Sequence, residues 1–120
     1  MSKKIMLVDD AAFMRMMIKN TLQQNGYTEI IEAKDGEEAV ALYQQEKPDL
    51  TLLDITMPNM DGLEALKAIK EINHECKIVM CSAMGQENMV LEALKFGAED
   101  FIVKPFKPER IMKTVTNILG

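Results

Sequence analysis

Five polar residues lie where apolar stretches of the sequence end, and their types are those that phosphoryl transfer uses. They are Asp9 and Asp10 after "KIMLV", Asp54 after "DLTLL", Ser82 within "KIVMCSA" and Lys104 after "DFIV". An ionised carboxylate can attack phosphorus and form an acyl phosphate. A hydroxyl and an ammonium group can position the phosphoryl oxygens and neutralise their charge. We therefore predict that Asp54 accepts a phosphoryl group, with Ser82 and Lys104 in contact with it.

Three of these residues are carboxylates, and bringing them together has an electrostatic cost. Like charges repel, so one carboxylate would hold a proton unless a cation compensated the charge. A hard divalent cation supplies that compensation, and Mg²⁺ prefers one or two carboxylates together with water and phosphate oxygens. We therefore expect Asp9, Asp10 and Asp54 to form a Mg²⁺ site that keeps Asp54 ionised.

Each of these residues, taken alone, has a simpler structural explanation. Asp10 could cap a helix and Asp54 could begin a turn. Lys104 could be a solvated lysine and Ser82 a loop hydroxyl. The functional interpretation is favoured because four separate segments of the chain each end in a suitable residue. It requires that the four ends meet, which depends on the fold.

The apolar runs have the length of β-strands and alternate with segments of helical periodicity. The predicted strands are residues 4–9, 28–33, 49–54, 77–83 and 100–104. Asp35 and Asp61 are each followed three residues later by Glu, which is a helix-start pattern. Gly26 and Gly97 suit the ends of helices, and Pro108 suits a first helical position. The pattern predicts five βα units.

Strands that alternate with helices and lack hairpin signals indicate a parallel sheet covered by helices on both faces. In such open sheets, ligands bind outside the carboxyl ends of the strands. We therefore predict a doubly wound α/β fold that brings the five polar residues to one edge. An X-Pro bond can be cis at modest cost, and we expect a cis peptide between Lys104 and Pro105 that aims the lysine inward.

Length and charge narrow the class of protein. A chain of 120 residues most simply forms one domain, residues 1–120. It has 19 acidic and 14 basic residues, which argues against binding to nucleic acid. The sequence has neither a stretch long enough to span a membrane nor a secretion signal, so we expect a cytoplasmic protein. Two cysteines and one histidine cannot form a zinc-type ligand set.

Eleven methionines are many for this length, and we expect them to serve two purposes. Met14, Met17, Met80 and Met112 are predicted to fill gaps in the core, because flexible thioethers suit irregular packing. Met84 and Met89 lie on or near the fourth predicted helix. There they are candidates for a docking surface that can repack against partners.

Four motifs resemble the receiver domain of two-component response regulators. They are "LVDD" (7–10), "LLDITMPNMDG" (52–62), "CSAMG" (81–85) and "FIVKPF" (101–106), and the resemblance covers essentially the whole chain. It implies a flavodoxin-like sheet with strand order 2-1-3-4-5. It also implies that Asp54 is the phosphoacceptor and that Asp10, Asp54 and the backbone carbonyl of Thr56 bind Mg²⁺ directly. Asp9 would act through water, and Ser82 and Lys104 would contact the phosphoryl group.

The segment "DDAAFMRMMIKN" (9–20) resembles single-domain chemotaxis regulators of the CheY type, and we expect no output domain after the last predicted helix. The resemblance implies a histidine kinase, a phosphatase and a flagellar motor switch protein as partners. In that family an aromatic residue swings inward on phosphorylation. Here it is Phe101, whose side chain has no hydroxyl, so the switch would depend on packing. We expect a monomer with a partner surface formed by Met84, Met89, Phe101, Lys104 and Phe106.

Other functions share part of this pattern. A stand-alone receiver could serve a phosphorelay unconnected with motility. A metal-dependent phosphohydrolase with an aspartyl-phosphate intermediate would use the same groups, but the sequence shows no second acid to protonate a leaving group. A flavodoxin-like mononucleotide carrier would need a Ser-, Thr- or Gly-rich first loop, where this chain has Asp9 and Asp10. We therefore favour a phosphorylation-controlled binding switch that catalyses only its own phosphorylation and dephosphorylation.

Overall fold

A computed structural model of the protein describes residues 3–120 and contains the five predicted βα units. The strands are β1 (Lys4–Val8), β2 (Glu29–Ala33), β3 (Leu50–Asp54), β4 (Ile78–Ser82) and β5 (Asp100–Val103). The helices are α1 (Ala12–Gln24), α2 (Gly36–Glu46), α3 (Gly62–Ile72), α4 (Glu87–Lys95) and α5 (Pro108–Leu119). Every predicted strand is confirmed, with ends that differ by at most one residue. Within residues 3–120, no helix combines the length and the apolar character needed to cross a membrane.

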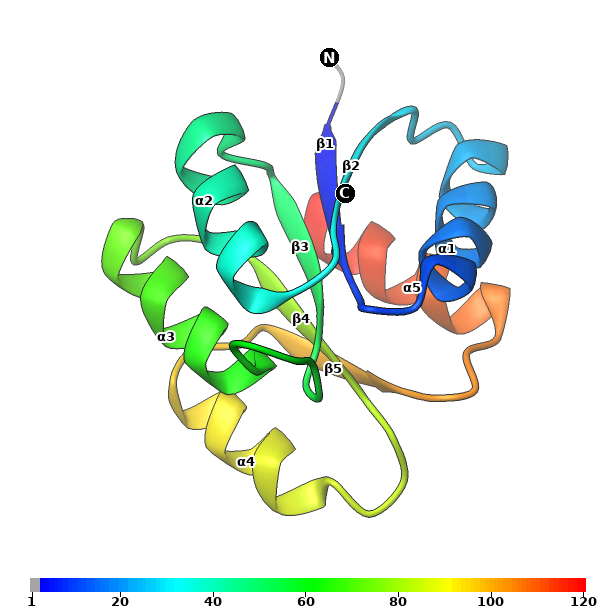
Figure 1. Cartoon of the computed structure of the whole chain (residues 1–120). Coiled ribbons are helices and arrows are strands. Elements are labelled where there is room, and N and C mark those ends of the chain that lie inside the picture. The colour runs from blue at the N-terminus through cyan, green and yellow to red at the C-terminus, as the bar shows by residue number, and fades with distance from the viewer. Residues whose placement is uncertain (1–2) are drawn as a thin grey trace.

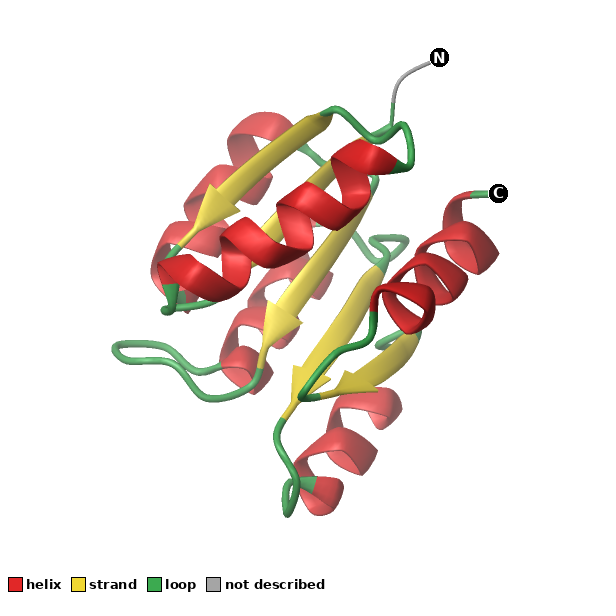
Figure 2. Cartoon of the chain, turned by 90° about the vertical axis from the view of Figure 1, so that its right-hand side faces the viewer, coloured by secondary structure: helices red, strands yellow, loops and turns green. Residues whose placement is uncertain are grey.

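The strands form one parallel sheet in the order β2-β1-β3-β4-β5, which confirms the predicted order and the doubly wound topology. Helices α1 and α5 cover one face, and α2, α3 and α4 cover the other (Figure 1). The strands all point toward the same edge of the sheet (Figure 2). We call this the carboxyl edge and the opposite one the amino edge.

Residues of the central strands are buried on both faces, which explains why their sequences are apolar without alternation. In β3, Leu52 belongs to the core beneath α1 and α5, while Leu53 belongs to the core beneath α2, α3 and α4. A fully buried leucine contributes roughly 1.5–3 kcal/mol relative to an exposed one. The packed sheet therefore supports the residues at its carboxyl edge from both faces.

The ends of the helices follow the signals in the sequence. Asp61 accepts the backbone N–H of Glu64 at 2.9 Å, and Glu64 accepts the N–H of Asp61 at 3.3 Å, which completes a capping box. Asp35 caps α2 by accepting the backbone N–H of Glu38 at 2.9 Å, but Glu38 bonds to the N–H of Lys34 rather than to that of Asp35. Gly26 and Gly97 follow α1 and α4 with φ of +92° and +100°. Glycine adopts this left-handed conformation without strain, and both predictions are confirmed.

The predicted role of the methionines is partly wrong. Met80 is fully buried, and Met14 and Met112 are half-buried, but Met17 is 43% exposed. Helix α1 turns Ile18 and Leu22 toward the core. Each residue of an α-helix is rotated by about 100° from the one before it, so Met17 points away from the face that Ile18 buries.

Candidate functional site

Three carboxylates converge at the carboxyl edge. Asp9 and Asp10 follow β1, Asp54 ends β3, and each offers a carboxylate oxygen within 4.8 Å of the other two. Asp54 is only 4% exposed and Asp9 is equally buried, whereas Asp10 is open to solvent. The neighbouring strands β1 and β3 are paired in register, Val8 with Leu53, and this pairing places the three side chains together.

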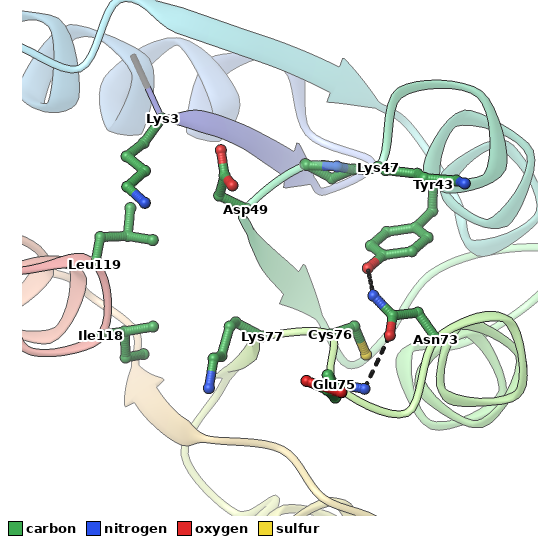
Figure 3. Close-up of a pocket in the computed structure, with 11 residues that line it drawn as sticks. Lys3, Tyr43, Lys47, Asp49, Asn73, Glu75, Cys76, Lys77, Ile118 and Leu119 are labelled. Carbon is green, nitrogen blue, oxygen red and sulfur yellow. Dashed lines mark hydrogen bonds between the residues drawn. The ribbon is translucent and has the colours of Figure 1, made fainter. Parts of the chain in front are cut away.

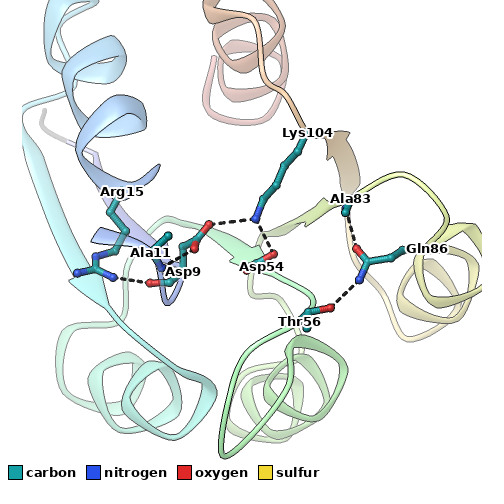
Figure 4. A network of polar contacts seen from close by, with 8 residues as sticks. All are labelled: Asp9, Ala11, Arg15, Asp54, Thr56, Ala83, Gln86 and Lys104. Atoms are coloured by element: carbon teal, nitrogen blue, oxygen red, sulfur yellow. Dashed lines mark hydrogen bonds and ion pairs between the residues drawn. The ribbon is translucent and has the colours of Figure 1, made fainter. Parts of the chain in front are cut away.

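Lys104 lies between the two buried carboxylates. Its Nζ is 3.2 Å from Oδ1 of Asp54 and 3.3 Å from Oδ2 of Asp9 (Figure 4). Its backbone N–H donates to the carbonyl of Ser82 at 2.7 Å, which ties the end of β5 to the end of β4. The predicted cis peptide between Lys104 and Pro105 is present. Residues from three strands thus meet in one polar cluster.

The cluster carries more negative than positive charge, and this affects proton binding. Burial and, after it, repulsion from Asp9 raise the pKa of Asp54 to about 6, even though attraction to Lys104 lowers it. Burial alone would lower the pKa of Lys104, but the charges of Asp54 and Asp9 raise it overall. Three carboxylates facing one ammonium group form an oxygen-rich donor set with uncompensated negative charge. Such a set fits a hard divalent cation.

The backbone around Asp9 is held by hydrogen bonds that could not be predicted from the sequence. Oδ1 of Asp9 accepts the N–H of Ala11 at 2.8 Å. The guanidinium of Arg15 donates to the backbone carbonyl of Asp9 and, at 2.8 Å, to Glu32 on β2. These contacts hold Asp9 while its other oxygen faces Lys104. Arg15 carries no recognisable signal in the sequence beyond its place on the helix that follows Asp10.

The loop after Asp54 is packed tightly against the start of α3. Gly62 donates its N–H to the carbonyl of Ile55 at 2.7 Å. A Cβ atom at Gly62 would lie 2.2 Å from the backbone oxygen of Asp54 and 2.7 Å from Cα of Ile55. Only glycine permits this approach, which fixes the chain immediately after Asp54. Thr56 lies on this loop, two residues beyond Asp54, and its side chain is exposed.

The loop after β4 approaches Thr56 from the other side. Ser82 ends β4 and is buried. The next residue, Ala83, donates its N–H to Oε1 of Gln86 at 2.6 Å, and Nε2 of Gln86 donates to the hydroxyl of Thr56 at 2.6 Å (Figure 4). Sequence reasoning missed Gln86. Its only signal is its position just before the fourth predicted helix.

An apolar hollow of about 370 Å³ lies between α4 and β5. Its lining residues are Ser82, Ala83, Met84, Glu87, Val90, Leu91, Leu94, Phe101 and Val103. Two residues of the predicted partner surface therefore meet here: Met84, which is 83% exposed, and Phe101, which is half-buried. Met89 and Phe106 do not line this hollow and pack against the cores on opposite faces of the sheet.

A second hollow, of about 330 Å³, opens at the amino edge (Figure 3). Its charged lining residues are Lys3, Lys47, Asp49, Glu75 and Lys77. Its polar groups are largely paired: Nδ2 of Asn73 donates to the hydroxyl of Tyr43 at 3.1 Å, and Asp49 accepts the N–H of Lys4 at 2.8 Å. Charges of both signs and paired polar groups give this hollow no evident specificity for one kind of ligand.

Comparisons with known proteins point to one family. The sequence profile of the response regulator receiver domain matches residues 5–116. The chain is 52% identical to the chemotaxis protein CheY of Bacillus subtilis (strain 168) over 120 residues, which cover both chains completely. It is 51% identical to the chemotaxis protein CheY of Thermotoga maritima over 118 residues, 98% of each chain. The crystal structure of the receiver domain of NtrX from Brucella abortus superimposes with a TM-score of 0.91 at 34% identity, covering 97% of this chain and 98% of that one.

Proposed function

The chain belongs to the response regulator receiver domain family, and from this premise we propose that it is a chemotaxis regulator of the CheY type, with one receiver domain over residues 1–120. Receiver domains are not conventional enzymes, so its activity is a change of state rather than turnover of a substrate. The two CheY proteins align with it over 98% or more of both lengths, which supports the assignment to chemotaxis.

The observation that carries the proposal is the buried carboxylate of Asp54, which lies within 4.8 Å of two other carboxylates and 3.2 Å from the ammonium group of Lys104. An oxygen of Asp54 attacks the phosphorus of a phosphohistidine on a kinase. The O–P bond forms as the N–P bond breaks, and the histidine nitrogen takes up a proton. Lys104 and the hydroxyl of Ser82 bind the phosphoryl oxygens and stabilise their charge.

Mg²⁺ is the proposed metal at this site. Asp10, Asp54 and the backbone carbonyl of Thr56 would hold it directly, and Asp9 through water. When bound, the cation offsets the repulsion among the carboxylates and the charge of the phosphoryl oxygens. The uncompensated carboxylates, all with oxygen donors, support this choice.

The output is binding to a flagellar motor switch protein in the cytoplasm. The apolar hollow between α4 and β5 supports a partner surface there, with Phe101 as the residue that changes its packing on phosphorylation. Met84 would contact the partner directly, and Met89, Lys104 and Phe106 complete the proposed surface. A histidine kinase supplies the phosphoryl group and a phosphatase removes it. Binding occurs as a monomer.

The proposal is tested by phosphorylating the purified chain with acetyl phosphate and Mg²⁺ and following the mass of the intact protein. The natural chain should gain one phosphoryl group, and Asp54→Ala should gain none. Asp49→Ala is the matched control, because Asp49 is an aspartate at the amino edge, and it should be phosphorylated normally. Equal phosphorylation of Asp54→Ala would contradict the proposal.

Pull-down with a flagellar motor switch protein then tests the assignment to chemotaxis. The phosphorylated natural chain should be retained more strongly than the unphosphorylated chain or Asp54→Ala. Retention that is independent of phosphorylation would remove motility from the proposal but leave the receiver chemistry intact.

A further inference from the structure

One side chain, that of Gln86, joins the loop after β3 to the loop after β4. It accepts the N–H of Ala83 and donates to the hydroxyl of Thr56, with both distances at 2.6 Å (Figure 4). Thr56 follows Asp54 by two residues, and Ala83 follows Ser82 directly. Gln86 therefore fixes the spacing between the loop of the proposed phosphoacceptor and the loop of its proposed hydroxyl contact.

Gln86 makes these bonds in place of the usual capping role at its position. It is the N-cap residue of α4, and N-cap side chains commonly accept an N–H of their own helix. The side chain of Gln86 makes no such bond, and only its backbone carbonyl serves the helix, accepting the N–H of Val90 at 3.0 Å. Gly85, with φ of +90°, makes the turn that brings the side chain back toward Ala83. The geometry thus commits this side chain to the contact between the loops.

A phosphoryl group on Asp54 would compete for the same hydrogen-bond donors. It adds a charge of about −1.5 to −2 and three strong acceptor oxygens. A hydrogen bond to an ionised acceptor is roughly twice as strong as one to a neutral amide oxygen. The N–H of Ala83 emerges beside Ser82 at the carboxyl edge, where it is bonded to the neutral Oε1 of Gln86. A charged acceptor at this edge therefore favours release of that N–H from Gln86.

We propose that Gln86 is a positioning residue that holds the loop of Ser82 in its resting place and releases the N–H of Ala83 when Asp54 carries a phosphoryl group. This inference rests on the proposed function. A contact made in only one of two states shifts the equilibrium by its differential free energy. For one net hydrogen bond, this corresponds to a roughly two- to tenfold change in an equilibrium constant. Gln86 thus lowers the affinity of the resting protein for a phosphoryl group by this factor.

The test uses beryllofluoride with Mg²⁺, a non-covalent mimic of the phosphoryl group, titrated into the full chain and followed by NMR. Gln86→Met keeps the length of the side chain but makes neither hydrogen bond, and it should bind the mimic roughly two- to tenfold more tightly. Thr56→Val removes only the contact of Gln86 with the hydroxyl and should shift the affinity in the same direction by less. Gln44→Met, at an exposed glutamine on α2, is the matched control and should bind as the natural chain does.

The side-chain amide protons of Gln86 supply a readout that a purely structural role would leave unchanged. Their resonances should shift when the mimic binds to the natural chain, while those of Gln44 stay in place. Equal or weaker binding by both Gln86→Met and Thr56→Val, or unchanged Gln86 resonances, would overturn the positioning role while the natural chain still binds the mimic. If the natural chain does not bind the mimic at all, the proposed function fails and this inference fails with it.

Discussion

The two edges of the sheet differ in the burial of their charged side chains. At the carboxyl edge, the buried carboxylates of Asp9 and Asp54 share the single ammonium group of Lys104. At the amino edge, the charged residues around the second hollow are all exposed. There Lys77 lies 3.8 Å from Glu99, a pair in which both side chains remain partly in water.

This difference shows at which edge the fold tolerates buried charges that are not fully compensated. Exposed charges are screened by solvent, and pairs between them contribute little to stability. Burying a charge without full compensation is costly, and groups in this state gather at functional sites. The amino edge is therefore built as ordinary surface. The carboxyl edge carries an electrostatic cost that a bound cation would relieve.

Two glycines at opposite edges give the largest expected difference in stability. Gly62→Ala would press a methyl group into the backbone at Asp54 and Ile55, so we expect a loss of about 3 kcal/mol or more in the free energy of unfolding. Gly26→Ala is the matched control at the amino edge. It has no atom within 4 Å of an added Cβ, and its positive φ should cost only about 1–2 kcal/mol. Urea unfolding measures both, and equal losses would show that the backbone around Asp54 can accommodate a methyl group at residue 62.

The next largest effect on the free energy of unfolding comes from the charge of Asp54 and depends on pH. Its pKa is about 6 in the folded protein, above the ordinary value of 3.8 that applies when the chain is unfolded. The folded state therefore binds more protons between pH 4 and pH 6, and stability falls as the pH rises through this window. Asp54→Asn removes the cost. Without Mg²⁺, we expect the variant to be about 2–3 kcal/mol more stable than the natural chain at pH 7.5 and no more stable at pH 4.

The control for this experiment lies at the amino edge. Glu75→Gln neutralises an exposed carboxylate there and should change the free energy of unfolding by less than about 0.5 kcal/mol at either pH. Mg²⁺ should stabilise the natural chain more than Asp54→Asn, because binding to the folded state adds stability. A gain for Asp54→Asn that is the same at both pH values would show that burial of charge is not its cause.

The sequence predicts which residues meet at the carboxyl edge better than it predicts the contacts between the loops there. Alternation of strands and helices determines that Asp9, Asp54, Ser82 and Lys104 come to one edge, because the carboxyl ends of parallel strands lie together. Gln86 could not be predicted in this way. Its partner Thr56 lies 30 residues earlier in the sequence, and their contact depends on the paths of two loops.

Helix α1 shows a different limit of prediction from sequence, because its buried face could not be identified. Phe13, Met14, Met16, Met17 and Ile18 are all apolar, so their spacing does not determine which side of the helix faces the core. The structure turns Ile18 and Leu22 inward and leaves Phe13 and Met17 exposed. A periodic pattern predicts a buried face only when the opposite face is polar.

Strand β3 runs from the amino edge to the carboxyl edge, so the two edges can be compared within this one element. It holds two buried polar side chains, Thr51 near its amino end and Asp54 at its carboxyl end. Oγ1 of Thr51 has no hydrogen-bond partner among the described residues. Thr51→Val replaces the hydroxyl with a methyl group of similar size, so we expect a gain of about 1 kcal/mol in the free energy of unfolding, measured in urea. Phosphorylation should be unchanged.

The two polar groups of β3 then differ in whether their removal affects phosphorylation. Replacing either should stabilise the protein, but only replacement of Asp54 should abolish phosphorylation. Thr51→Ser is the control, since it keeps the hydroxyl and removes a buried methyl group, and it should lose about 1 kcal/mol. If Thr51→Val were instead less stable than the natural chain, the hydroxyl would have a partner in solution. The strand would then carry only one uncompensated polar group, Asp54, at the edge where the chemistry is proposed.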